Sequence, residues 1–303
     1  MATMTEIPEA ASTVERSHDY HAEAHVLSGH LQRPIEQKIE EHAPVKLKDR
    51  RGGHLTRFAE EVSIEGLITF AKGHTRVSGA RSLKHNGWIT LSTSVVEGLN
   101  VFEIITADRV VSQVSTDHPY LNGHVPQVTF LGTQFQNFQV SGFPVTLTLN
   151  LGICGDRPAN DRSYLQDAKF LNVVKEQTEK IAKANGLPKD LKEQYHGKLA
   201  RIEKLIKTSD ASDQGHREPI TCSLVQSIGA IPIPGVQIFG HVIVIPEFGS
   251  VALGEVEVGE RMEEGSQIPS PYFELTSIHM KLGCVGHGTA KAGTAAANGH
   301  THP

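Results

Sequence analysis

The chain has 303 residues, which is enough for one large domain or two smaller ones. Its net charge of −5 disfavours a protein that binds the phosphate backbone of nucleic acids. Three cysteines, none of them in a CxxC pair, exclude a disulfide framework, and Cys222 and Cys284 are expected to be buried thiols or a single bridge.

Residues 1–20 are polar and show no hydrophobic period, so we expect a disordered N-terminal tail. The tail lacks the apolar core of a signal peptide. No stretch of the chain approaches the roughly 18 apolar residues that a membrane span needs. The expectation is therefore a cytoplasmic protein that does not contact a membrane.

Residues 21–155 are expected to form a first block of strands, because runs rich in β-branched residues alternate with turn-forming glycines. Segment 145–153 places Val, Leu, Leu and Leu on one side and Thr, Thr and Asn on the other. Segment 88–96 alternates Ile, Leu and Thr against Thr, Ser and Ser. This one-sided pattern predicts an antiparallel sheet with one solvated face.

Residues 156–215 are expected to form an inserted helical hairpin. Apolar residues recur at helical spacing from Leu165 to Ile181 and again from Leu191 to Leu205, and Pro188 is a typical start for the second helix. Segment 175–207 carries nine basic and five acidic residues, which is typical of a solvated helix face. The apolar face of the hairpin must be buried, either on the β body or on another chain.

Residues 216–288 are expected to form a second block of strands that shares one core with the first, and the alternative is two β domains joined by the hairpin. Val251 and Leu253 have one parity and Val256 and Val258 the other, so a bulge at Gly254 is expected. Without that bulge, the side chain of Glu255 would point inward. Residues 289–303 are small and polar, and we expect a flexible C-terminal tail or a weak edge strand.

These elements predict a mainly β protein with a two-sheet, sandwich-like body and an inserted α-helical hairpin. Several runs of sequence, among them SVVEGLNV (94–101), TADRVVSQVSTDHP (106–119) and FGHVIVIPEFGSVALGE (239–255), resemble a family of uncharacterised bacterial proteins. The resemblance extends from about residue 26 to residue 288. It implies a bacterial source and a single architecture, and it implies no activity, cofactor, partner or catalytic residue.

Histidine is abundant, with 17 residues. On a helix, the spacing of His18, His21 and His25 would place three imidazoles on one face, where they could bind Zn²⁺, and exposed histidines are the alternative. A second possible metal cluster is His279, Cys284 and His287, although a common ion would require a sharp bend in the strand. No other cofactor is indicated.

Five further residues are candidates for facing a ligand: Asp108, Arg109, His118, His241 and Glu255. Asp108 and Arg109 could equally form a structural ion pair or a solvated rim. His241 lies in an apolar run, where a hydrogen-bonded core histidine is the alternative to a ligand-binding one.

The chain has no GxSxG, HExxH or GxxxxGK[ST] motif. The function favoured by the sequence is therefore a non-enzymatic structural or binding protein that forms a homo-oligomer. Apolar strands with edges able to pair support this hypothesis. The alternative is a metal-dependent hydrolase or another metalloenzyme with histidine ligands, and it rests on the abundance of histidine alone. No small-molecule ligand can be named.

Overall fold

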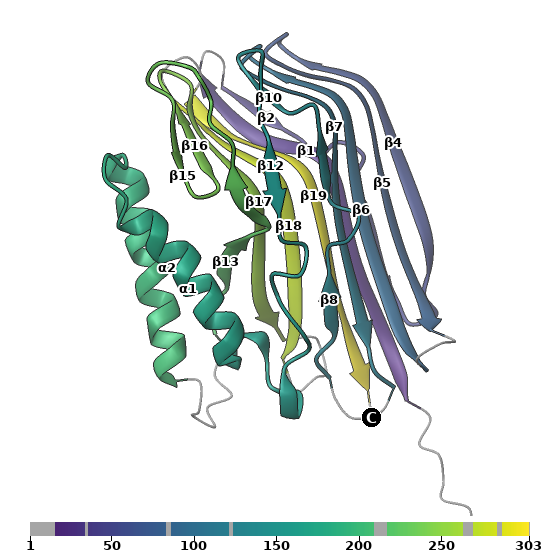
Figure 1. Ribbon diagram of the computed structural model, residues 1–303. Helices are drawn as coiled ribbons and strands as arrows, with labels where there is room; N and C mark the ends of the chain where they lie inside the picture. Colours follow the sequence, from purple (N-terminus) through teal and green to yellow (C-terminus); the bar gives the residue numbers. More distant parts are fainter. Residues whose placement is uncertain are drawn as a thin grey trace, which may run out of the picture.

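The computed structural model describes residues 16–33, 36–82, 86–120, 124–208, 217–262, 269–283 and 287–302. In these residues the chain is mainly β, with two antiparallel sheets packed against each other and a pair of helices at one side (Figure 1). The predicted fold class is therefore confirmed.

The first part of the chain consists almost entirely of strands. They are β1 (Ser17–Arg33), β2 (Gln37–Ile39), β3 (Val45–Asp49), β4 (Gly53–Ile64), β5 (Ile68–Ser82), β6 (Gly87–Val101), β7 (Ile105–His118), β8 (Gln127–Thr129), β9 (Gln134–Gln136), β10 (Gln139–Val140), β11 (Phe143–Pro144) and β12 (Leu147–Leu149).

Helices follow, and then a second series of strands. They are the 3₁₀ helices η1 (Ala159–Asp161) and η2 (Tyr164–Gln166), the helices α1 (Ala168–Ala182) and α2 (Lys189–Thr208), and the strands β13 (Ile220–Ser223), β14 (Val225–Ile228), β15 (Gln237–Phe239), β16 (Val242–Ile245), β17 (Gly249–Arg261), β18 (Ser270–Leu282) and β19 (His287–His302).

Among the described strands, one sheet has the order β15-β16-β17-β18-β19-β1-β2, with β13 paired to β17 and β3 paired to β1. We call it the first sheet. The second sheet has the order β11-β10-β7-β6-β5-β4, with β8 and β9 paired to β7, and strands β12 and β14 form a separate pair. Strand β4 therefore lies at an edge of the second sheet, far from the helices (Figure 1).

The two ends of the described chain meet in the middle of the first sheet. Strand β1 pairs with β19 over nearly their whole length, from Ser17 opposite His302 to Arg33 opposite His287. The expected flexible tail at 289–303 is thus wrong for all described residues of that segment, which form an inner strand. The expected disorder of residues 1–20 is likewise wrong from residue 17 onward, and residues 1–15 lie outside the described chain.

The small residues that suggested a tail have a packing role in β19. Four alanines of this strand are fully buried between β1 and β18, namely Ala290, Ala292, Ala295 and Ala297. Gly293 lies so close to the second sheet that an added Cβ would come 2.6 Å from the Ser112 hydroxyl oxygen. Composition misled the sequence prediction here because small side chains also suit a strand packed closely against another sheet.

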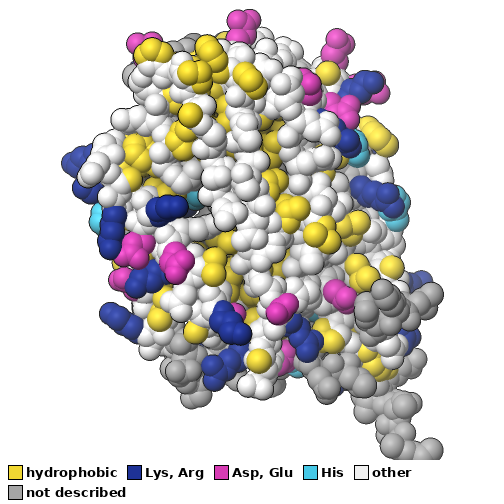
Figure 2. All heavy atoms as spheres, viewed as in Figure 1, with side chains coloured by type: hydrophobic (Ala, Val, Ile, Leu, Met, Phe, Trp, Pro, Cys, Tyr) yellow, Lys and Arg dark blue, Asp and Glu magenta, His cyan; other side chains and the backbone are white. Residues whose placement is uncertain are grey.

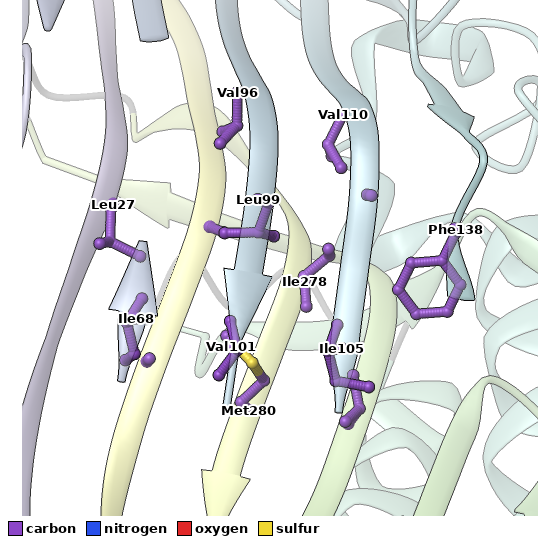
Figure 3. Close-up of a cluster of buried hydrophobic side chains, with 14 of the residues drawn as sticks. Leu27, Ile68, Val96, Leu99, Val101, Ile105, Val110, Phe138, Ile278 and Met280 are labelled. Carbon is purple, nitrogen blue, oxygen red and sulfur yellow. The ribbon is translucent and has the colours of Figure 1, made fainter. Parts of the chain in front are cut away.

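The main hydrophobic core combines residues from both strand blocks. Leu27, Leu99 and Ile105 of the first block pack with Ile278 and Met280 of the second, all at most 1% exposed (Figure 3). The blocks therefore share a core cluster across the two sheets, and burial of these side chains supplies most of the driving force for their packing.

Small hydroxyl side chains also join the two sheets. Ser92 and Ser94 are fully buried, and their hydroxyls donate hydrogen bonds of 2.6 and 2.8 Å to the backbone carbonyls of Glu23 and His25. The inner face of this part of β6 is thus its Thr/Ser face, and Leu91 points to the other side, half-exposed. The hydroxyls of Ser92 and Ser94 therefore both have a hydrogen-bond partner, as a buried polar group requires.

The parity of β17 changes at Gly254, as the sequence suggested, but by a different device. Leu253 and Val256 are both buried, and Gly254 has a φ of +61°. The pairing with β18 keeps one register through this point, because Leu253 faces Ile278 and Glu255 faces Thr276. A left-handed glycine reverses the side-chain alternation without the extra residue of the expected bulge.

We expect the substitution Gly254→Ala to lower the free energy of unfolding by about 1–2 kcal/mol, because a left-handed conformation is unfavourable for a residue with a Cβ. Urea denaturation would measure the change. Gly197→Ala is the matched control, since this exposed glycine lies in the middle of α2 with open space around it, and it should stabilise the protein. Equal effects at the two sites would contradict the explanation.

The helical hairpin packs its apolar stripe on the β body. Asp167 caps α1 by accepting hydrogen bonds from the backbone amides of Lys169 and Phe170. Predicted stripe residues Leu171, Val174, Ile181, Leu191, Tyr195, Ile202 and Leu205 are all buried, whereas Ala168 is exposed. The sequence left open whether the apolar face of the hairpin packs on the β body or on another chain. Strands of the same chain, including β15 and β16, cover it.

Candidate functional site

Glu255 lies at the centre of a buried polar cluster between the hairpin and the first sheet. It follows Gly254 on β17, and the change of parity directs its side chain away from the inter-sheet core and toward α2. Its side chain is 11% exposed. A carboxylate this deeply buried needs charged or hydrogen-bonding partners.

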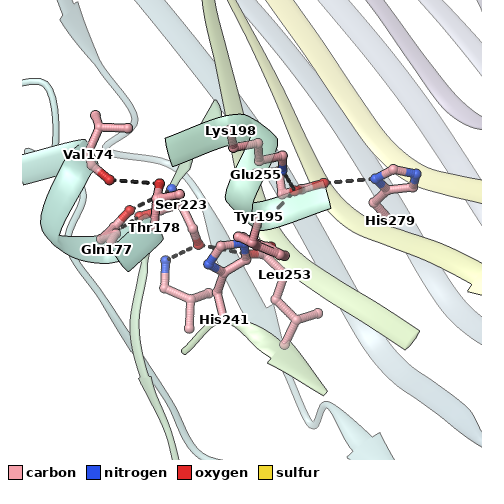
Figure 4. Close-up of polar contacts among 11 residues, drawn as sticks. Val174, Gln177, Thr178, Tyr195, Lys198, Ser223, His241, Leu253, Glu255 and His279 are labelled. Carbon is pink, nitrogen blue, oxygen red and sulfur yellow. Dashed lines mark hydrogen bonds and ion pairs between the residues drawn. The ribbon is translucent and has the colours of Figure 1, made fainter. Parts of the chain in front are cut away.

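Nitrogen atoms of two side chains, each from a different element, lie within hydrogen-bond distance of the Glu255 carboxylate. Lys198 Nζ of α2 lies 3.1 Å from Glu255 Oε1, and His279 Nδ1 of β18 lies 2.8 Å from Oε2. His241 Nε2 lies 3.9 Å from Oε1 and 3.1 Å from the hydroxyl oxygen of Tyr195 (Figure 4). We call these five residues the Glu255 cluster.

The electrostatics of the cluster favour an ionised Glu255. Burial raises the pKa of this carboxyl, but the charge of Lys198, the nearby His241 and the hydrogen bond with His279 outweigh burial and hold the pKa well below its usual value. Burial, together with the charge of Glu255, raises the pKa of the Tyr195 hydroxyl. At neutral pH, Glu255 is therefore an ionised carboxylate and Tyr195 is a neutral phenol.

A second polar contact fixes the other helix. The Gln177 side chain of α1 donates a hydrogen bond of 2.9 Å to the Ser223 carbonyl of β13 and accepts one of 3.0 Å from its amide. Both helices are thus tied to the first sheet through side chains, in addition to their apolar contacts. These side-chain contacts attach the hairpin to the first sheet.

A groove of about 530 Å³ lies beside the cluster, between α1 and the residues around β14 and the β15–β16 turn. His241 forms part of its wall, along with Val173, Gln177 and Lys180. His241 is therefore the member of the Glu255 cluster that lines this groove. Acidic and basic side chains are mixed along the groove, so its charge selects no ligand class.

A separate group of histidines lies where β1, β7 and β19 meet. The ring of His18 stacks on Trp88 with centroids 5.1 Å apart and lies 4.6 Å from the ring of His118. Thr301 Oγ1 is 3.1 Å from His18 Nδ1. Burial lowers the pKa of His18 to about 2 and that of His118 to about 3, so both imidazoles are neutral at neutral pH.

The predicted metal cluster of His18, His21 and His25 does not form, because these residues lie on a strand rather than a helix. Strand alternation turns His18 toward Trp88, while His21 approaches Asn298 and His25 bonds Ser28. In the second predicted cluster, His279 belongs to the Glu255 cluster and His287 is exposed, and Cys284 lies outside the described residues.

No group of three or more His, Cys, Asp or Glu side chains in the described chain is arranged to hold a metal ion. The expected zinc site therefore gains no support from these residues. The thiols of Cys154 and Cys222 are both buried and free, and burial raises the pKa of Cys222 to about 12.

The other ligand-facing candidates are dispersed. Asp108 is exposed and accepts a hydrogen bond of 3.2 Å from the Asn137 amide. Arg109 Nε lies 3.5 Å from Glu97 Oε1 across β6 and β7. Of the five candidates, His241 and Glu255 alone come together, and sequence reasoning missed their partners Tyr195 and Lys198. The available signal was a lysine three residues after a tyrosine of the buried stripe.

The fold and the site together define a two-sheet antiparallel β protein whose helical hairpin is attached through a buried charge cluster. The chain belongs to a family described as "Domain of unknown function (DUF8256)", whose model matches residues 18–259. The expected resemblance to an uncharacterised family is thereby confirmed. The search of curated proteins found no match. None of the described helices combines the length and apolar character required to cross a membrane.

Proposed function

We propose that this protein is a non-enzymatic structural or binding protein that self-associates. The observation that carries the proposal is the open edge of the second sheet at β4. This strand is 12 residues long, it pairs with β5 on one side, and no other described strand pairs with it. A long edge of this kind is a template for pairing with another chain.

Exposed apolar side chains on the same strand support the proposal. Phe58 is 74% exposed and Leu55 is 44% exposed, on opposite faces of β4. Figure 2 shows hydrophobic, basic, acidic and histidine side chains together on the right-hand side of the molecule, over β4 and β5. Large apolar side chains beside an open edge favour an interaction surface.

The Glu255 cluster supports a structural role as well. Its charged members bond to one another and attach the hairpin. With a net charge of −5, nucleic acid is not the partner that we propose. The proposed partner is a second copy of the chain, in the cytoplasm of a bacterium.

Native mass spectrometry of the untagged protein tests the proposal. We expect a defined oligomer at high micromolar concentration. A strictly monomeric species over the whole accessible concentration range would overturn self-association. Elemental analysis of the same sample, purified without chelator, tests the metalloenzyme hypothesis, which stoichiometric zinc or iron would revive.

A further inference from the structure

Five histidines lie together at the end of the molecule where the two ends of the described chain pair, and we call them the terminal histidine cluster. They are His18 and His21 of β1, His118 of β7, and His300 and His302 of β19. The start of β1 and the end of β19 lie side by side at the lower end of the molecule (Figure 1). His18 and His118 are at most 1% exposed, and their rings meet between the two sheets. Water therefore does not reach these two imidazoles while the strand ends stay paired.

The packing around His18 accepts a neutral ring and disfavours a charged one. Its Nδ1 lies 3.1 Å from Thr301 Oγ1, but its Nε2 has no hydrogen-bond partner among the described residues. That nitrogen lies against Gly299, where an added Cβ would come 2.4 Å from it. A protonated imidazole donates from both nitrogens. A charged His18 would therefore bury an unsatisfied donor, which is costly.

The titratable groups that face these two rings are mostly other histidines. His118 of β7, His300 of β19 and His21 of β1 lie near His18. His300 also faces His118, together with His124 from the segment that follows β7. A proton on one of these rings raises the cost of a proton on the next, because like charges repel strongly in a poorly solvated place.

The carboxylate of Asp19 is the group among the described residues that favours a charged His18. It is already engaged, because His302 Nε2 lies 2.8 Å from Asp19 Oδ2 and Arg50 Nε donates a hydrogen bond of 2.8 Å to Oδ1. The backbone of Gly299 favours a charged His118, but burial outweighs it. The two rings therefore gain most from protonation when they reach water.

We propose that the terminal histidine cluster is a pH-sensitive switch, in which acidification to about pH 5 protonates His18 and His118 and opens the paired ends of β1 and β19 while the two-sheet core stays folded. The opening is local because the cluster occupies the last few residues of each strand, whereas the main hydrophobic core includes β1 from Val26 onward. The strand ends need to lose only their own contacts for the imidazoles to reach water.

The direction of the switch follows from proton binding. Burial lowers the pKa of His18 to about 2 and that of His118 to about 3 while the ends are paired, and both imidazoles return to the ordinary value of 6.5 when they are hydrated. The opened state therefore binds more protons below pH 6.5. Each imidazole favours opening by up to about tenfold per pH unit as pH decreases, and the two together by up to about a hundredfold.

Hydrogen exchange of the full-length protein at pH 7 and pH 5 tests the proposal, with rates corrected for the intrinsic pH dependence of exchange. Residues 17–21 and 298–302 should be protected at pH 7 and should exchange within about tenfold of the unstructured rate at pH 5. Residues 24–31 and 288–295, on the same two strands, are the internal control and should stay at least about a thousandfold more protected than the ends at pH 5. Ends that remain protected at pH 5, or ends and interior that are equally protected at both pH values, overturn the switch.

Trp88 supplies an independent readout, because it is the single tryptophan of the chain and its ring stacks on His18 with centroids 5.1 Å apart. Opening should shift its fluorescence emission to longer wavelength as pH falls from 6.5 to 5, with nearly unchanged far-UV circular dichroism. An emission shift that coincides with loss of the circular dichroism signal would show global unfolding and would contradict a local switch.

The variant His118→Phe assigns the protons. It keeps an aromatic ring of similar size that takes up no proton, so protection of the strand ends should fall by at most about tenfold per pH unit. His196→Gln, at an exposed position on α2, is the matched control and should behave like the original protein. If His118→Phe kept the original pH dependence, His118 would not be part of the switch. The wild-type exchange and fluorescence measurements decide the proposal even where this variant fails to fold.

Discussion

Replacing Glu255 by glutamine is expected to lower the free energy of unfolding by about 3 kcal/mol. The substitution keeps the shape of the side chain but leaves Lys198, which is 18% exposed, without its counter-charge. Breaking a buried ion pair on one side is costly because the remaining charge stays in a poorly solvated place. Urea denaturation at neutral pH measures the change, and hydrogen exchange should show loss of protection in α2 first.

Two further variants make this prediction specific. Glu193→Gln breaks an exposed ion pair, in which Glu193 lies 3.9 Å from Lys189 and the two side chains are 71% and 91% exposed, respectively. This variant should change the free energy of unfolding by less than about 0.5 kcal/mol. The double variant Glu255→Leu with Lys198→Met should recover much of the loss, because it removes both charges. If Glu255→Gln were as mild as Glu193→Gln, the cluster would not attach the hairpin.

Acidification is expected to destabilise the protein steeply between pH 6.5 and pH 5, through His18 and His118. Their pKa values are about 2 and about 3 in the folded protein, below the ordinary value of 6.5. The unfolded chain therefore binds more protons below pH 6.5, and stability falls as pH decreases. Each imidazole contributes a slope of up to about 1.4 kcal/mol per pH unit. Urea denaturation at several pH values measures the slope.

Above pH 5, the expected loss of stability comes from these histidines and not from the carboxylates. The pKa of Glu255 is also lowered, so its contribution is retained above the ordinary carboxyl range and is lost as pH falls through its folded pKa, at lower pH. His118→Gln should reduce the slope by about 1 kcal/mol per pH unit, whatever it does to the overall stability. His196→Gln, at an exposed position on α2, is the control. An unchanged slope in His118→Gln would contradict the assignment.

The sequence predicted the secondary structure of the hairpin and the inner strands because their periodicity reports burial directly. From Leu171 to Ile181 the helical spacing of apolar residues corresponds to the buried face. The prediction from sequence failed for β19, where alanine and glycine fill the narrow space between the sheets. Composition cannot distinguish such a strand from a flexible tail, because the constraint comes from the opposite sheet.

The candidate site shows the same limit. The two parities around Gly254 indicated that Glu255 would leave the inter-sheet core, and this is where the structure places it. What receives it, Lys198 on a helix 57 residues earlier in the chain, depends on how the hairpin docks. The histidine spacing in β1 led to a wrong prediction of a metal site for a local reason. His18 and His21 lie on a strand, where side chains alternate with a period of two rather than the 3.6 of a helix.

The measurement that tests the central claim most directly is hydrogen exchange in β4 as a function of protein concentration. Half of the β4 amides point away from β5 and bond to no described strand. If two copies pair through this edge, these amides in residues 53–64 should exchange rapidly at low micromolar concentration and slowly at several hundred micromolar. Exchange in β4 that is equally fast at both concentrations would contradict self-association through this strand.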